Sequence, residues 1–188
     1  MRGRTIRVPK SEVRPTQDRV REALFSSLQL DVPDARFLDL FAGSGAVGLE
    51  AVSRGASAVC WVEESGAVFK ILKSNIAKLC GDYDQQLLRC VRGDVFDFVQ
   101  RCPSGTPFDI IFADPPYQKR GRNNRIPSPS QLLVDILKSD LLSGDGILVL
   151  EQGADEPLPD VSGWELVRDK RYGGARLRFF RKCDTSEK

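Results

Sequence analysis

The chain of 188 residues contains no histidine. Serine–histidine and cysteine–histidine catalysis and histidine-ligated metals are therefore excluded as its chemistry. Long hydrophobic runs are also missing, because no apolar stretch approaches the roughly 18 residues that span a membrane. The basic start, Met1-Arg2-Gly3-Arg4, lacks the apolar centre of a signal peptide. We therefore expect no membrane partner.

Cysteine is scarce and irregularly placed. The five cysteines, at positions 60, 80, 90, 102 and 183, are odd in number and never in C-x-x-C spacing. This pattern favours reduced thiols in a cytosol over a disulfide framework or a zinc site. The sequence therefore predicts a cytoplasmic protein without a metal.

Length and composition are ordinary for a globular domain. Hydrophobic residues make up 41% of the chain and charged residues 29%, without an internal repeat or a low-complexity segment. A chain of this length is large enough for one core. We predict a single domain over 1–188, with a basic N-terminal segment and helix at 1–30, a core at 31–182 and a tail at 183–188. We expect a monomer.

The most informative motif is Asp114-Pro115-Pro116-Tyr117, which follows an apolar run at 108–113. The run predicts a buried parallel strand, and the prolines end it because neither can donate a ladder hydrogen bond. An acidic side chain, fixed carbonyl groups and an aromatic ring then meet at the carboxyl end of a strand, where open α/β sheets bind ligands. This set fits the exocyclic amine of a nucleobase, with Tyr117 stacked on the ring. A proline turn after a chance aspartate is the simpler alternative.

A second motif, G-x-G-x-x-G, lies between a predicted strand and a predicted helix. Gly43 allows a tight turn, Gly45 allows a ligand to approach the backbone, and Gly48 allows close packing of helix on strand. Glu63 ends the next predicted strand, twenty residues after Gly43, where an acid accepts both hydroxyls of a ribose. The pattern predicts an adenosine-containing cofactor, either NAD or S-adenosylmethionine.

Two further acids bear on the choice between these cofactors. Asp39 lies just ahead of the glycines, where it suits the positive amino acid part of S-adenosylmethionine and would repel a pyrophosphate. Asp94 follows a third predicted strand and is placed to accept from the adenine amino group, with Val95 against the ring. Asp94 equally suits the N-cap of the next helix, and the two roles are compatible. The combination favours S-adenosyl-L-methionine.

Strands and helices alternate along most of the chain. We predict helices at 16–28, 46–54, 66–80, 95–101 and 130–138, the first capped by Thr16-Gln17-Asp18. We predict strands at 36–41, 58–63, 87–92, 108–113, 147–151, 164–172 and 176–181. The last two strands are joined by the hairpin dipeptide Gly173-Gly174. This order predicts an α/β fold, a doubly wound, seven-stranded, mostly parallel sheet with an antiparallel edge strand.

The positively charged residues are clustered along the sequence, although the formal net charge is only +2. Basic residues crowd the first segment, the loop directly after Tyr117 and the C-terminal strands. A local basic field of this kind attracts phosphate backbones, whereas a solvated face is the alternative for the C-terminal group. The loop from Gln118 to Pro129 is the better candidate for nucleic-acid binding, because it leaves the Asp-Pro-Pro-Tyr corner directly.

A family resemblance rests on three segments, Arg14 to Phe25, Leu38 to Gly45 and Asp114 to Tyr117. In this order and spacing they resemble the bacterial 16S rRNA guanine-N2 methyltransferases of the RsmD type, and the resemblance extends from about Arg14 to Arg181. It implies a class I methyltransferase fold, S-adenosylmethionine as methyl donor and a guanine as the methylated base. It also implies 16S rRNA, within the 30S subunit or its assembly intermediate, as the partner.

The motifs, the charge pattern and the resemblance together assign three groups of residues. The guanine is assigned to Asp114, Pro115, Pro116 and Tyr117. The cofactor is assigned to Asp39, Phe41, Ala42, Gly43, Gly45, Glu63, Asp94, Val95 and Asp114. The rRNA is assigned to Arg14, Thr16, Arg19, Lys119, Arg120 and Arg122.

Other functions remain open. An N6-adenine methyltransferase shares the Asp-Pro-Pro-Tyr corner but usually carries an added target-recognition domain. A glutamine-N5 protein methyltransferase normally has asparagine where this chain has Asp114. An NAD-dependent oxidoreductase would explain the glycines and Glu63 but gives the corner no role. A catalytically silent RNA-binding module would keep the basic patches without needing both motifs intact.

Overall fold

The computed structural model describes residue 7 and residues 15–81, 83–84, 86–101, 105, 107–116 and 128–183. For residues 15–17 it describes the backbone alone. Several of the assigned residues therefore lie outside the described residues: Arg14, Tyr117, Lys119, Arg120, Arg122 and the side chain of Thr16.

Helices and strands alternate as the sequence predicts. The helices are α1 (Pro15–Ser27), α2 (Ala46–Ser53), α3 (Gly66–Leu79), α4 (Val95–Arg101) and α5 (Pro129–Lys138). The strands are β1 (Arg36–Leu40), β2 (Ala58–Glu63), β3 (Leu88–Arg92), β4 (Phe108–Ala113), β5 (Leu142–Gly153), β6 (Trp164–Tyr172) and β7 (Ala175–Lys182). Within the described ranges, no helix has the length and apolar character needed to cross a membrane.

The strands form one sheet in the order β3-β2-β1-β4-β5-β7-β6. Strands β3, β2, β1, β4 and β5 pair in parallel, whereas β7 pairs antiparallel with both β5 and β6. The chain runs outward from β1 to β3 and then crosses back to β4, so the strand order reverses between β1 and β4. Open α/β sheets bind ligands at such a switch point. The predicted fold is confirmed, and the reversed strand β7 lies between β5 and the edge strand β6.

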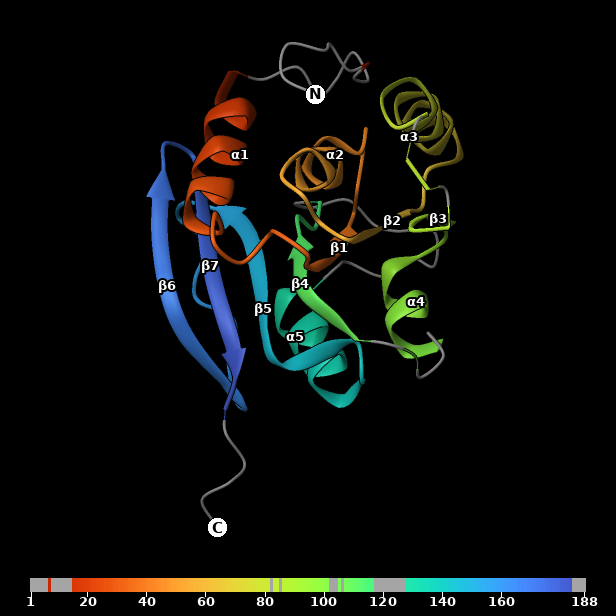
Figure 1. Ribbon diagram of the computed structural model, residues 1–188. Helices are drawn as coiled ribbons and strands as arrows, with labels where there is room; N and C mark the ends of the chain where they lie inside the picture. Colours follow the sequence, from red (N-terminus) through yellow and green to blue (C-terminus); the bar gives the residue numbers. More distant parts are fainter. Residues whose placement is uncertain are drawn as a thin grey trace.

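Helices cover both faces of the sheet, with α1, α2 and α3 on one face and α4 and α5 on the other (Figure 1). Because side chains alternate along each strand, the sheet has one hydrophobic core on each face. On β1, Phe37 points to the first face, which α1, α2 and α3 cover, and Leu38 and Leu40 point to the second face, which α4 and α5 cover. Strands covered on both faces are apolar at nearly every position. Asp39 is the exception in β1, a carboxylate only 1% exposed.

The start of α1 differs from the prediction. The helix already begins at Pro15, so the predicted cap at Thr16-Gln17-Asp18 is wrong. Proline is favoured at the first helical position, where no N–H is required. Asp18 lies instead within the first turn, where its charge suits the helix dipole, and it pairs with Arg21 at 2.8 Å.

Strand β5 is longer than the predicted 147–151. Leu142 already pairs with Phe108, and the ladder resumes where Ile147 pairs with Ile110. Residues 143–146 of β5 stand opposite the single residue Asp109, so the register shifts there, and the sequence shows this stretch only as a glycine-rich approach to the apolar run.

Trp61 on β2 packs against the glycine-rich turn. Its side chain is fully buried. A Cβ atom at Gly48 would lie 2.6 Å from Trp61 Cε2 and 2.9 Å from Val59 Cγ1, both closer than real Cβ contacts. The predicted role of Gly48 in close helix–strand packing is therefore confirmed.

We expect Gly48→Ala to lower the free energy of unfolding by about 1–3 kcal/mol, because the indole ring must move to admit a methyl group. Urea unfolding followed by fluorescence measures the change. Gly144→Ala is the matched control, since nothing lies within 4 Å of a Cβ there, and its effect should stay within about 0.5 kcal/mol. Equal losses in the two variants would contradict the packing argument.

Candidate active site

The turn between β1 and α2 follows an unusual backbone path. Phe41, Gly43 and Gly45 all have positive φ angles, of 61°, 55° and 84°. A positive φ is natural for glycine but costs a residue with a side chain on the order of 1–2 kcal/mol, and such strain concentrates at functional sites. The turn is fastened by hydrogen bonds from the Ala42 N–H to the Val62 carbonyl at 2.9 Å and from the Gly45 N–H to the Ala42 carbonyl at 2.8 Å. Its conformation is therefore fixed before any ligand binds.

Glu63, the last residue of β2, ties this turn to the start of α3. One carboxylate oxygen accepts from the Gly43 N–H at 2.9 Å and the other from the Ser65 N–H at 2.7 Å. Burial raises the pKa of Glu63, and these two hydrogen bonds partly oppose the rise. Each carboxylate oxygen can accept more than one hydrogen bond, so Glu63 keeps acceptor capacity for ribose hydroxyls.

Asp39 lies beneath the turn. Its carboxylate accepts from the Gly48 N–H at 2.9 Å, which fixes the first turn of α2 against β1. Burial raises the pKa of Asp39 well above its usual range, the Gly48 bond lowers it, and the charges of Asp114 and Glu63 raise it further. Sequence reasoning assigned Asp39 to the cofactor, and the structure gives it this additional backbone partner.

Asp94 caps α4, as one of its two predicted roles requires. Its side chain accepts from the Asp97 N–H at 3.0 Å, and its carbonyl accepts from the Phe98 N–H at 3.0 Å. The side chain of Val95 is buried in the core on the face of α4 and α5. The adenine contact predicted for these two residues stays a prediction.

The Asp114-Pro115-Pro116 corner follows β4 directly, next to β1 in the sheet. Asp114 is half-buried, Pro115 is buried and Pro116 is exposed. The ring of Pro115 restricts its φ angle, and the following Pro116 restricts its ψ angle to extended values, so the direction of the Pro115 carbonyl is constrained. An acceptor side chain and a fixed carbonyl therefore stand at the switch point.

Glu151 is a member of the site that sequence reasoning missed. It lies on β5, beyond Leu150, which pairs with Ala113. Burial, followed by the negative charge of Asp114, raises the pKa of Glu151 to about 8. The signal was present in the sequence, because Glu151 ends an apolar run just as Glu63 and Asp114 do.

The four acids occupy consecutive strands at one edge of the sheet: Glu63 on β2, Asp39 on β1, Asp114 after β4 and Glu151 on β5. A row of acidic side chains in a partly buried position favours a cationic ligand, which would stabilise their ionised forms. The described segments contain no group of three or more acidic or cysteine residues arranged to hold a metal ion.

Asn75 is the second residue that sequence reasoning missed. Its amide, 1% exposed on α3, donates to the carbonyls of Ser44 at 2.9 Å and Arg7 at 2.8 Å, and accepts from the Arg7 N–H at 2.9 Å. The backbone of the basic N-terminal segment is thereby joined to the glycine-rich turn. The signal was an asparagine among the apolar positions Leu72, Ile76 and Leu79 of one helix face.

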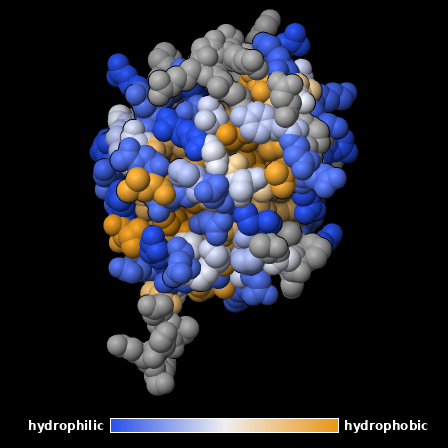
Figure 2. Space-filling view, viewed as in Figure 1, coloured by the Kyte–Doolittle hydropathy of each residue, from blue (hydrophilic) through white to orange (hydrophobic). Residues whose placement is uncertain are grey.

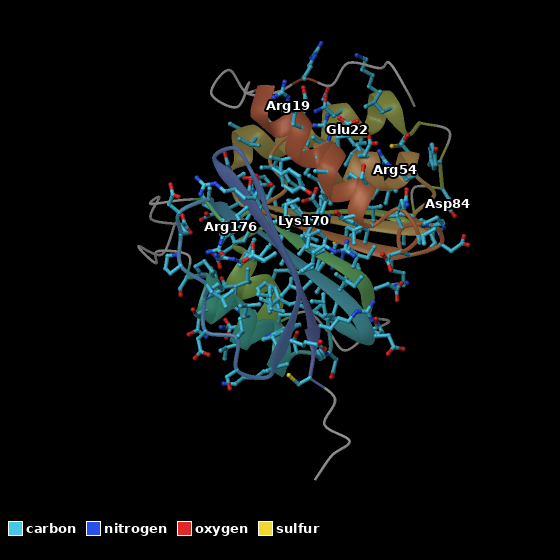
Figure 3. All side chains as sticks on the ribbon, turned by 90° about the vertical axis from the view of Figure 1, so that its left-hand side faces the viewer. Arg19, Glu22, Arg54, Asp84, Lys170 and Arg176 are labelled. Carbon is cyan, nitrogen blue, oxygen red and sulfur yellow. The ribbon has the colours of Figure 1, made fainter. Side chains whose placement is uncertain are left out.

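Of the residues assigned to RNA, the structure describes the side chain of Arg19 alone. It is exposed on α1, the helix that also carries Glu22, and this helix lies above the hairpin strands that carry Lys170 and Arg176 (Figure 3). The face of the molecule seen in Figure 2 is mainly hydrophilic, with hydrophobic atoms in small separate groups.

Comparisons with known proteins agree with this geometry. Residues 1–181 match the model of a family described as conserved hypothetical protein 95. The ribosomal RNA small subunit methyltransferase D of Escherichia coli K12 is 37% identical over 183 residues, which are 96% of this chain and 86% of that protein. The protein of the same name from Haemophilus influenzae is 31% identical over 180 residues, covering 95% and 89% of the two chains.

Solved structures give the same result. "Putative methyltransferase yhhF from Escherichia coli" superposes with a TM-score of 0.80 at 32% identity and covers 97% of this chain and 94% of its own. "Crystal structure of SMU.776, a putative methyltransferase complexed with SAH" has a TM-score of 0.68 and covers 89% of this chain and 50% of its own. Its identity is 17%, so it bears on the fold alone.

The sheet order, the glycine-rich turn and the acids at the switch point define a Rossmann-like α/β protein of the class I methyltransferase type. The match over residues 1–181 and the identity of the relatives place it more narrowly. The chain belongs to the family of RsmD-type methyltransferases.

Proposed function

We propose that this protein transfers a methyl group from S-adenosylmethionine to the N2 amine of a guanine in 16S ribosomal RNA. The observation that carries the proposal is the Asp114-Pro115-Pro116 corner beside the glycine-rich turn, in a chain of this family. The names of the two bacterial relatives support small-subunit rRNA as the substrate. The resemblance of the segment from Arg14 to Phe25 supports guanine N2 as the methylated atom.

The residues at the switch point suit this cofactor in charge and in hydrogen-bonding capacity. When bound, S-adenosylmethionine supplies an electrophilic methyl group on a positively charged sulfur. The backbone of 41–45 would hold its amino acid part, and the row of acids matches its positive charge. Glu63 would accept from the ribose hydroxyls, and the start of α4 at Asp94 and Val95 would lie against the adenine.

Asp114 and the Pro115 carbonyl would hold the amine of the base. The N2 lone pair is delocalised into the guanine ring, so the amine is a poor nucleophile until its two hydrogens are fixed by acceptors. Holding the amine against the methyl group replaces an encounter in solution by proximity, which supplies much of the rate. The N2 lone pair forms the new N–C bond, the electron pair of the broken S–C bond stays on sulfur, and the surplus N2 proton leaves to Asp114.

The rRNA would be bound by the basic N-terminal segment and by the loop after Tyr117, with Arg14, Thr16, Arg19, Lys119, Arg120 and Arg122 as contacts. An unpaired guanine is the least costly target, because an enzyme must expose the edge of a base before it can act there. A domain of this size gains part of its recognition from an assembled particle, so the 30S subunit or its assembly intermediate is the proposed substrate.

We expect Asp114→Ala to reduce turnover on the order of 10²-fold or more, because an acceptor aimed at the reacting nitrogen is lost. Cofactor affinity should change little. Single-turnover transfer of labelled methyl to unmethylated 30S subunits measures the first quantity, and calorimetry measures the second. Asp145→Ala, at an exposed position on β5, is the control and should retain normal turnover. Near-normal turnover in Asp114→Ala would overturn the assignment.

We expect Glu63→Ala to weaken S-adenosylmethionine binding at least roughly tenfold, since hydrogen bonds to a charged group contribute about 1.5–3 kcal/mol each. Calorimetric titration with S-adenosylmethionine and with NAD measures the effect, and circular dichroism checks that the fold is retained. The neighbouring variant Glu64→Ala should bind as the wild type does. Tighter binding of NAD than of S-adenosylmethionine by the wild type would favour an oxidoreductase instead.

A further inference from the structure

Glu151 and Asp114 lie at the same level on neighbouring parallel strands. Ala113 of β4 pairs with Leu150 of β5, and both side chains belong to the core covered by α4 and α5. The next residue of each strand is an acid, Asp114 and Glu151. Alternation along β5 directs Glu151 to the opposite face, where its cross-strand partner Leu177 is fully buried. The register therefore brings the two acids next to each other where β4 ends, and the charge of Asp114 acts on Glu151.

The surroundings of Glu151 provide no compensating cation among the described residues. On β7, Arg178 binds Gln152 and Asp169, and Arg176 pairs with Asp169. Both arginines lie one position away from Leu177 and so point to the other face of the sheet.

Two described cations lie on the β6 side of the first face: Arg168 lies over the Phe179 ring and donates to the Ser27 carbonyl, and Lys170 is exposed, across β7 from Glu151. On α1, Arg21 pairs with Asp18, and Arg19 and Glu22 are exposed. On β1, the charged group is Asp39, which adds negative charge beside Asp114. Burial and the charge of Asp114 raise the pKa of Glu151 from 4.5 to about 8, so its carboxyl group holds a proton at neutral pH.

We propose that Glu151 is a positioning residue for the reaction, holding the single proton of a carboxyl pair so that Asp114 remains the charged, correctly oriented acceptor for the amine of the base. The role rests on the proposed function and deepens it. Two ionised carboxylates side by side would repel each other and move Asp114 out of line. A neutral Glu151 removes the repulsion and can donate to Asp114. In the reaction, the N2 proton passes to Asp114, while the proton on Glu151 stays in place.

Methyl transfer measured against pH tests the proposal. Wild-type turnover on 30S subunits, at saturating cofactor, should fall several-fold as pH rises through about 8. Glu151→Gln, which is neutral at every pH, should lie within about threefold of the wild type at pH 7 and stay level to pH 9. Glu151→Ala should lose about tenfold or more at pH 7, a loss expected in turnover and not in cofactor KM. Glu165→Gln, an exposed acid at the start of β6 and so at the far edge of the sheet, should keep the wild-type profile.

A second measurement does not depend on methyl transfer. The folded state binds the Glu151 proton more tightly than the unfolded state, so wild-type stability in urea should fall between pH 4.5 and about 8 relative to Glu151→Gln. Parallel stability curves, or identical pH–rate profiles for the wild type and Glu151→Gln, would overturn the role of Glu151. If the stability curves diverge but the protein methylates no rRNA, the proton shared by the carboxyl pair is supported. The proposed function is then rejected, and the positioning role of Glu151 with it.

Discussion

Backbone N–H groups hold the acidic side chains at the carboxyl edge of this sheet, and the rest of the site depends on those bonds. Glu63 accepts from Gly43 and Ser65, and Asp39 accepts from Gly48. A carboxylate taken out of water is stable only where donors replace the lost water. These bonds therefore do two things at once: they oppose part of the rise in carboxyl pKa that burial causes, and they fix the glycine-rich turn between β1, β2 and α3.

The same constraint explains why the edge suits methyl transfer. Burial raises the pKa of both Asp39 and Glu151, and the charges of neighbouring acids raise it further. A cation bound there stabilises the ionised carboxylates. In the proposed reaction the methyl donor carries a positive charge on sulfur that its product lacks, so the edge favours donor binding over product retention.

Most of the fold was predictable from periodicity. Apolar runs in β1, β2 and β4 alternate with helical segments, and a strand buried on both faces leaves little ambiguity. The errors arose in two places: Pro15 starts α1 ahead of the predicted cap, and β5 pairs with β4 across a register shift before its apolar run begins. Pairing of that kind depends on the neighbouring strand and is not encoded locally.

The site was predictable where a motif carries its own geometry. Gly48 and the N-cap at Asp94 occupy the positions that their spacing requires. Glu151 and Asn75 each left a local sign in the sequence, an acid that ends an apolar run and an asparagine among apolar helix positions, but the partners that define their roles are remote in sequence. Glu151 gains its character from Asp114 one strand away, and Asn75 from Arg7 and Ser44. Those contacts arise from the strand register and from the connections between distant segments. A short stretch of sequence does not contain both partners.

The most direct test of the central claim is nucleoside analysis of 16S rRNA after methyl transfer from labelled S-adenosylmethionine, with unmethylated 30S subunits and free 16S rRNA compared side by side. The predicted result is label in N2-methylguanosine at one site, with the 30S subunits as the better substrate. Label in N6-methyladenosine, or in ribosomal protein only, would contradict it.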